Sequence, residues 1–135
     1  MTRKVAFITG ANRGIGLETA RGLGRLGIEV VLGVRNAERA EEAVAALRAE
    51  GITASAIAFD AKKPGTFHNA YDHIAHHYGQ LDILVNNAGV LQEELFGADV
   101  TGVSPTVLRE TFDVNFFAVV ELTQLLLPLI RLAPE

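Results

Sequence analysis

The stretch Thr9-Gly10-Ala11-Asn12-Arg13-Gly14-Ile15-Gly16 decides how the rest of this chain folds. It follows an apolar run at 5–8 and opens an amphipathic helical pattern. Glycines let the backbone approach an anion closely, and the first-turn N–H groups and the helix dipole supply positive potential. A strand, a glycine-rich turn and a helix in this order therefore predict a site for a phosphate group.

Strand and helix patterns alternate along the whole chain. The sequence predicts strands at 5–9, 30–34, 53–59 and 81–85, and helices at 14–25, 36–50, 64–78 and 106–132. In the first helix, Ala20, Leu23 and Leu26 are spaced to face one side. The order βαβαβαβα predicts one domain, 1–135, of the α/β class: a Rossmann-like, doubly wound parallel sheet with strand order 3-2-1-4 and its ligand at the carboxyl ends of the strands.

The composition excludes several classes of protein. A net charge of −4 argues against a nucleic-acid binder or an anionic-membrane binder. The chain has no cysteine, so it has no disulfide and no thiolate metal site. The apolar run at 5–8 is too short for a signal peptide, and we therefore expect a cytoplasmic protein.

Three further motifs follow the glycine turn at compatible spacings. Asp60 follows the third predicted strand, Asn86-Asn87-Ala88-Gly89 follows the fourth, and Asn115 lies inside the last helix. Together with the glycine turn, these residues resemble the N-terminal, coenzyme-binding half of the short-chain dehydrogenase/reductase family, in particular its NADP-preferring, carbonyl-reductase-like members. The resemblance covers essentially the whole chain.

The resemblance implies a set of cofactor-binding residues. They are Gly10, Asn12, Arg13, Gly14, Ile15, Gly16, Arg35, Asn36, Asp60, Ala61, Asn87, Ala88 and Gly89. In the family the acid matched by Asp60 meets the adenine. Asn115 matches the asparagine of the family's catalytic tetrad. No metal-binding residue is predicted.

The residues at the end of the second strand favour NADP(H) over NAD. An acid there would bind the ribose 2′-hydroxyl of NAD, whereas Val34 occupies the position and Arg35 follows it. A guanidinium can bind two oxygens of the 2′-phosphate of NADP. Arg13 resembles the second basic residue of NADP-preferring members. Lys62 and Lys63 are interpreted as a solvated turn, although they are close enough to Asp60 to touch the edge of a cofactor.

The family's proton donor has no counterpart in these 135 residues. The family uses a serine and a tyrosine with a lysine four residues later, but Tyr71 and Tyr78 are followed at that spacing by Ala75 and Asp82. We therefore expect an NADP(H)-dependent oxidoreductase of carbonyl or alcohol substrates of which this chain supplies the coenzyme half, inactive alone. The alternative is a non-catalytic nucleotide-binding or interaction module with the same fold.

The last predicted helix, 106–132, is apolar nearly all round. Such a helix is buried on more than one side, and in the family it packs on the sheet and joins a partner's helix. We therefore expect a homo-oligomer through this helix, or pairing with a C-terminal piece. Asn115, Glu121, Gln124 and Pro128 argue against a transmembrane span.

Two polar groups are interpreted as solvated surface. His73 and His77 have a spacing that can bind zinc, but Phe67, Ala70 and Ile74 on the same helix face the core, which leaves the histidines in water. The acids Glu93, Glu94 and Asp99 lie in a loop without metal-ligand order.

Overall fold

A computed structural model describes residues 3–90 and 101–135 of the chain. Four parallel strands form one sheet in the order β3-β2-β1-β4, as the sequence predicts. The strands are β1 Val5–Thr9, β2 Glu29–Val34, β3 Ala54–Ala58 and β4 Ile83–Val85. The helices are α1 Gly14–Arg25, α2 Ala37–Ala49, α3 Phe67–His77, α4 Pro105–Phe112 and α5 Ala118–Arg131, with a 3₁₀ turn η1 Pro64–Thr66 and a π-helical turn η3 Asp113–Phe117.

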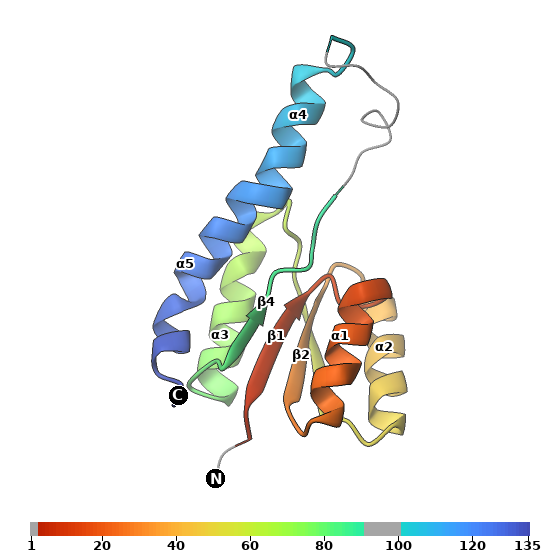
Figure 1. The fold of residues 1–135 in the computed structure, drawn as a ribbon, viewed down its shortest axis with the longest axis vertical. Helices are drawn as coiled ribbons and strands as arrows, with labels where there is room; N and C mark the ends of the chain where they lie inside the picture. Colours follow the sequence, from red (N-terminus) through yellow and green to blue (C-terminus); the bar gives the residue numbers. More distant parts are fainter. Residues whose placement is uncertain (1–2, 91–100) are drawn as a thin grey trace.

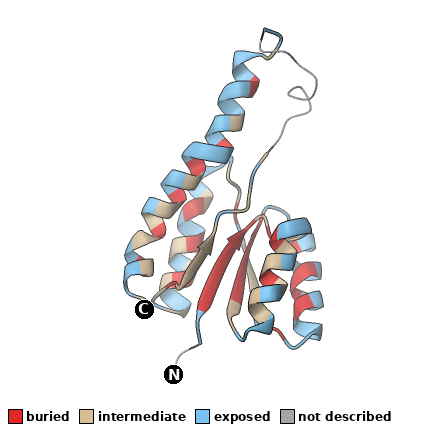
Figure 2. Ribbon diagram, viewed as in Figure 1, coloured by how far each residue is buried: buried red, intermediate tan, exposed pale blue. Residues whose placement is uncertain are grey.

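Helices cover both faces of the sheet (Figure 1). α1 and α2 pack on one face, against Ala6 and Ile8 of β1, whereas α3 and α5 pack on the other, against Val5 and Phe7. Successive side chains of a strand point to opposite faces, so β1 is buried on both sides (Figure 2). This doubly covered sheet aligns the carboxyl ends of β1, β2 and β4 beside the start of α1.

Several boundaries differ from the sequence-based prediction by a few residues. Pro64 begins η1, and α3 begins only at Phe67, because the first turn is 3₁₀. The prediction for Leu26 is wrong: it follows the last turn of α1 and is 77% exposed. The predicted loop with Glu93, Glu94 and Asp99 lies outside the described residues.

The last predicted helix extends without a break from Pro105 to Arg131. Its middle turn, η3, is π-helical, and α4 and α5 lie on either side of it. Oγ of Ser104 accepts a hydrogen bond from the N–H of Val107 and so caps this helix. Among the described residues this run alone is long and apolar enough to cross a membrane, by length and composition. Core helices of water-soluble proteins pass the same test, and Leu122, Leu126 and Leu129 pack here in the core beneath the sheet.

Candidate functional site

The glycine turn wraps tightly around the end of β1. Gly10 and Gly14 have φ values of +62° and +59°, which L-residues with a side chain rarely adopt. The buried hydroxyl of Thr9 accepts hydrogen bonds from the backbone N–H groups of Asn87 and Ala88, at 3.0 and 2.8 Å. The turn after β1 and the turn after β4 are thus bound to one another.

No described side chain caps the N-terminus of α1. Its N-cap residue, Arg13, makes no capping hydrogen bond, and the first turn carries no acid. By contrast, Asn36 caps α2 by accepting from the N–H groups of Glu38 and Arg39. Since the first N–H groups of a helix lack intrahelical partners, the start of α1 presents donors and positive potential to an anion.

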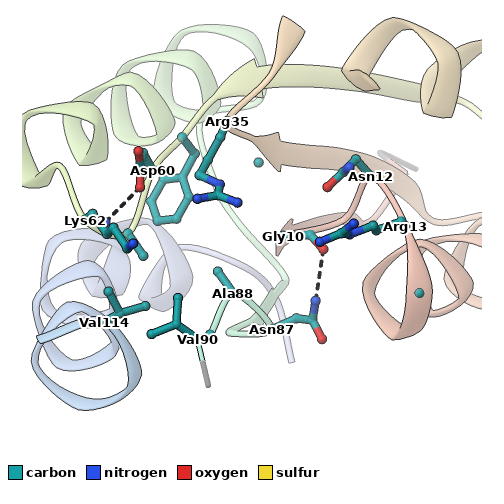
Figure 3. Close-up of a pocket in the computed structure, with 15 residues that line it drawn as sticks. Gly10, Asn12, Arg13, Arg35, Asp60, Lys62, Asn87, Ala88, Val90 and Val114 are labelled. Atoms are coloured by element: carbon teal, nitrogen blue, oxygen red, sulfur yellow. Dashed lines mark hydrogen bonds between the residues drawn. The ribbon is translucent and has the colours of Figure 1, made fainter. Parts of the chain in front are cut away.

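A pocket of about 270 Å³ opens beside this helix start (Figure 3). Its lining comes from the ends of all four strands and from η3. The lining residues are Gly10, Asn12, Arg13, Gly14, Gly33, Arg35, Phe59, Asp60, Ala61, Lys62, Asn87, Ala88, Gly89, Val90 and Val114. The structure therefore brings ten of the thirteen predicted cofactor-binding residues to one cavity.

Charged side chains of both signs surround the pocket. Figure 3 shows Asp60 and Lys62 on one side, Asn12 and Arg13 on the other, and Arg35 between them. The backbone N–H of Lys62 donates to Oδ1 of Asp60 at 2.9 Å, which fixes the carboxylate at the rim. Within residues 3–90 and 101–135, none of the three cations forms an ion pair, so their charge is available to a ligand.

Ile15, Gly16 and Asn36 are predicted cofactor-binding residues that do not line the pocket. Ile15 is exposed at the start of α1, and Asn36 is the N-cap of α2. Gly16 is buried behind the turn, where an added Cβ would lie 2.5 Å from both the Gly10 oxygen and Nδ2 of Asn87. Gly16 thus shapes the turn by its lack of a side chain.

Asn115 lies in the π-helical turn η3 and binds the backbone that leaves β4. Its Oδ1 accepts from the N–H of Val90 at 2.7 Å, and its Nδ2 donates to the oxygen of Val90 at 2.6 Å. An added Cβ at Gly89 would lie 3.2 Å from the same Oδ1. π-Helical turns are often found at functional sites, and this one joins the last helix to the rim of the pocket.

Gly33, Phe59, Val90 and Val114 line the pocket but were not predicted to do so. Val90 directly follows the motif at 86–89, and Phe59 directly precedes Asp60, so adjacency was an available signal. Gly33 is explained only by packing, because a Cβ there would lie 2.9 Å from Cζ of Phe7. Val114 directly precedes Asn115, so the same signal of adjacency was available for it.

The amino ends of the strands hold a second polar cluster, remote from the pocket. The hydroxyl of Tyr78 donates to Oε1 of Glu29 at 2.8 Å, and burial, followed by the bond to Glu29, raises the pKa of Tyr78. His73 was predicted to be solvated, but it is half-buried, with its ring 4.4 Å from that of His77. Its Nε2 has no hydrogen-bond partner among residues 3–90 and 101–135. Burial lowers the pKa of His73, as do the charges of His77 and His76, while Glu29 opposes them.

No metal centre is found in the part of the chain that the structure describes. There, no three histidine, cysteine, aspartate or glutamate side chains are grouped so that they could hold an ion. The geometry defines a nucleotide-sized pocket at the carboxyl edge of a parallel sheet, beside a glycine turn, a helix start and two arginines that form no ion pair among the residues described.

The short chain dehydrogenase family profile matches residues 4–133. The chain is 37% identical over 133 residues to Carbonyl reductase [NADPH] 1 of Mus musculus, covering 96% of this chain and 46% of the relative. It is 37% identical over 130 residues to Dehydrogenase/reductase SDR family member 7B of Bos taurus, covering 92% and 39%. A solved metagenomic short-chain oxidoreductase in complex with NADP superposes with a TM-score of 0.84 at 33% identity, covering 94% of this chain and 56% of that one.

The chain therefore belongs to the short-chain dehydrogenase/reductase family. L-sorbose reductase from Gluconobacter frateurii, solved with NADPH and L-sorbose, superposes with a TM-score of 0.86 at 30% identity over 96% of this chain and 48% of that one. The chain spans less than half the length of the two curated relatives described above.

Proposed function

We propose that this chain is the coenzyme-binding part of an NADP(H)-dependent oxidoreductase that acts on small carbonyl or alcohol substrates. The proposal rests on one observation: Arg13 and Arg35, which form no ion pair in the described part of the chain, lie at one pocket together with the start of α1. The printed names of the relatives support the same cofactor: a carbonyl reductase that uses NADPH and a short-chain oxidoreductase in complex with NADP.

The residues present fit a dinucleotide phosphate. The first-turn N–H groups of α1 and the open space beside Gly14, where an added Cβ would meet nothing within 4 Å, would hold the pyrophosphate. The carboxylate of Asp60 and the backbone of Ala61 would hold the adenine, and the turn at Ala88 and Gly89 would line its other side. The nicotinamide of the bound coenzyme supplies the hydride chemistry.

Preference for NADP(H) over NAD follows from the end of β2. Val34 is 3% exposed and apolar, so no carboxylate is there to bind the 2′-hydroxyl of NAD or to repel a 2′-phosphate. The exposed guanidinium of Arg35, with Arg13 across the pocket, offers several N–H donors to that phosphate.

Asn115 acts in this proposal as a positioning residue. Its two hydrogen bonds to Val90 hold the backbone after β4 against η3, and so fix the rim formed by Ala88 and Gly89. Any further part in proton transfer, which the family resemblance implies, requires residues that this sequence does not contain.

Fluorescence titration of the purified chain with NADPH and with NADH tests the proposal. We expect saturable binding of NADPH, at least tenfold tighter than that of NADH, which corresponds to about 1.4 kcal/mol. The affinity for NADPH should fall as the salt concentration rises, because salt screens the attraction between the arginines and the 2′-phosphate. Equal affinity for the two coenzymes would overturn the NADP preference, and no binding of either would overturn the proposal.

We propose, in addition, that a second copy of the chain packs on the outer face of the last helix. Large apolar side chains are exposed along it: Leu108, Phe112, Phe116, Phe117 and Val120. Exposed apolar patches of this kind mark protein interfaces. Sedimentation velocity should show a dimer or larger species that Phe116→Glu converts to monomer, and a monomer at high concentration would contradict the proposal.

A further inference from the structure

β3 is the outermost strand on one side of the sheet. Its pairing register with β2 determines which of its backbone groups face the free edge. The N–H of Val30 donates to the oxygen of Thr53, and the N–H of Phe59 donates to the oxygen of Val34. In a parallel ladder alternate residues bond to the same neighbour. Ala54, Ala56 and Ala58 therefore turn their N–H and C=O groups away from β2, toward the outside.

Two side chains from opposite faces of the sheet reach this edge. Nε of Arg48, in α2, donates to the oxygen of Ala54 at 3.1 Å. Nδ2 of Asn69, in α3, donates to the oxygen of Ala58 at 3.2 Å. The first and last outward carbonyls of β3 are thus occupied, and only Ala56 between them keeps an outward carbonyl without a partner among the described residues.

Without the side chains of Arg48 and Asn69, the free edge of β3 would be suited to pairing with another strand. The segment at 53–59 is Thr-Ala-Ser-Ala-Ile-Ala-Phe, which has no charge, no proline and no glycine. A groove of about 510 Å³ also runs beside it, between α2 and β3, and Arg48 lines this groove together with Ala56 and Ile57. Uncharged edge strands are templates for strand addition, and natural sheets block them with charged side chains.

We propose that Arg48 and Asn69 close the β3 edge against strand addition by occupying the carbonyls that an incoming strand would need. An incoming strand forms its bonds to every second residue of the edge. Two of the three outward carbonyls are already engaged, and the guanidinium of Arg48 brings a charge that an apolar strand would have to desolvate. When both side chains are removed, the occupant should be the same strand of a second copy.

The test is the double variant Arg48→Met, Asn69→Ala, in which methionine keeps the aliphatic stem of Arg48 but has no donor. We expect its sedimentation velocity to show species of twice the mass of the parent's own state, at a concentration where the parent shows none. We also expect the variant, and not the parent, to bind a synthetic peptide with the sequence of residues 53–59. Arg39→Met with His68→Ala is the matched control, because both are exposed on the same two helices and neither bonds to β3.

A third substitution separates edge pairing from simple loss of stability. Ala56→Pro, added to the double variant, removes the outward N–H that strand addition uses, while the bonds to β2 come from Ser55 and Ile57 and are kept. We expect the triple variant to return to the parent's mass and to lose peptide binding. A double variant with the parent's mass and no peptide binding would overturn the proposal, as would association that persists in the triple variant.

Discussion

The two ends of the sheet differ in how they use their polar groups. At the amino ends, Oδ2 of Asp82 accepts a hydrogen bond from the N–H of Val5 at 2.8 Å, and the hydroxyl of Tyr78 donates one to Glu29. At the carboxyl ends, Arg13 and Arg35 line a pocket and form no ion pair within the described residues. Paired polar groups therefore stabilise the fold at the amino ends, whereas the unpaired cations beside the cavity belong to the proposed coenzyme site.

The largest effect is expected at the carboxyl end, from Gly16→Ala. Its Cβ would lie 2.5 Å from the oxygen of Gly10 and 3.0 Å from Cα of Ala11, so the backbone of the turn must shift. We expect a loss of about 2–3 kcal/mol in the free energy of unfolding and at least about tenfold weaker NADPH binding. Urea unfolding and fluorescence titration measure the two quantities.

Gly22→Ala is the control for this substitution. Gly22 lies on the exposed side of α1, where an added Cβ meets nothing within 4 Å. Alanine there should raise the free energy of unfolding by about 0.5–1 kcal/mol and leave NADPH binding unchanged. If both variants behaved alike, the close packing at Gly16 would not be what shapes the turn.

Arg35→Ala tests whether the unpaired charge at the carboxyl end serves the ligand. A hydrogen bond to a charged group contributes about 1.5–3 kcal/mol. We therefore expect roughly 10- to 100-fold weaker NADPH binding, with NADH binding and thermal stability nearly unchanged. Arg39→Ala, on the exposed face of α2 and outside the pocket, should leave NADPH binding, NADH binding and thermal stability unchanged. If Arg35→Ala weakened the binding of both coenzymes equally, that result would contradict a contact with the 2′-phosphate.

At the amino end, Asp82→Ala should lower stability and leave coenzyme binding unchanged, the reverse of the effect expected for Arg35→Ala. This substitution leaves the N–H of Val5 without its carboxylate acceptor and should lower the free energy of unfolding by about 1–2 kcal/mol. NADPH affinity at the far end of the sheet should not change. The control Asp72→Ala, on the exposed face of α3, should change the free energy of unfolding by no more than about 0.5 kcal/mol. Weaker NADPH binding in the Asp82→Ala variant would contradict the prediction, because it would show that the two ends of the sheet are coupled.

The smallest effect is a pH dependence at the amino end. Burial, and then His77 and His76, lower the pKa of His73 in the folded chain, and the charge of Glu29 opposes them. As pH falls through about 6.5, the unfolded chain takes up the proton first, so stability is lost in that direction. Between pH 7.5 and 5.5, the decrease in unfolding free energy should be smaller for His73→Gln than for the parent or for His68→Gln, and an unchanged decrease would contradict the assignment.

Most of the fold could be predicted because each local signal pointed to the same answer. Gly10 marks a turn and Asn36 marks a helix start through their own chemistry, and the structure places both as expected. The prediction for Leu26 is wrong because helical spacing continues past the residue at which α1 ends. The π-helical turn at Asn115 could not be predicted, since nothing in the residues at 113–117 differs from an ordinary helix.

The sequence by itself determined the succession of strands and helices, the glycine turn and the chemical character of the site, because local conformation and apolar periodicity act over short spans. Only the tertiary structure decided which groups bind one another. It paired Asn115 with Val90 and Asn87 with Gly10, and it placed Tyr78 beside Glu29 at the end of the sheet away from the pocket. These contacts join residues far apart in the chain, and their partners are fixed by how helices pack on the sheet.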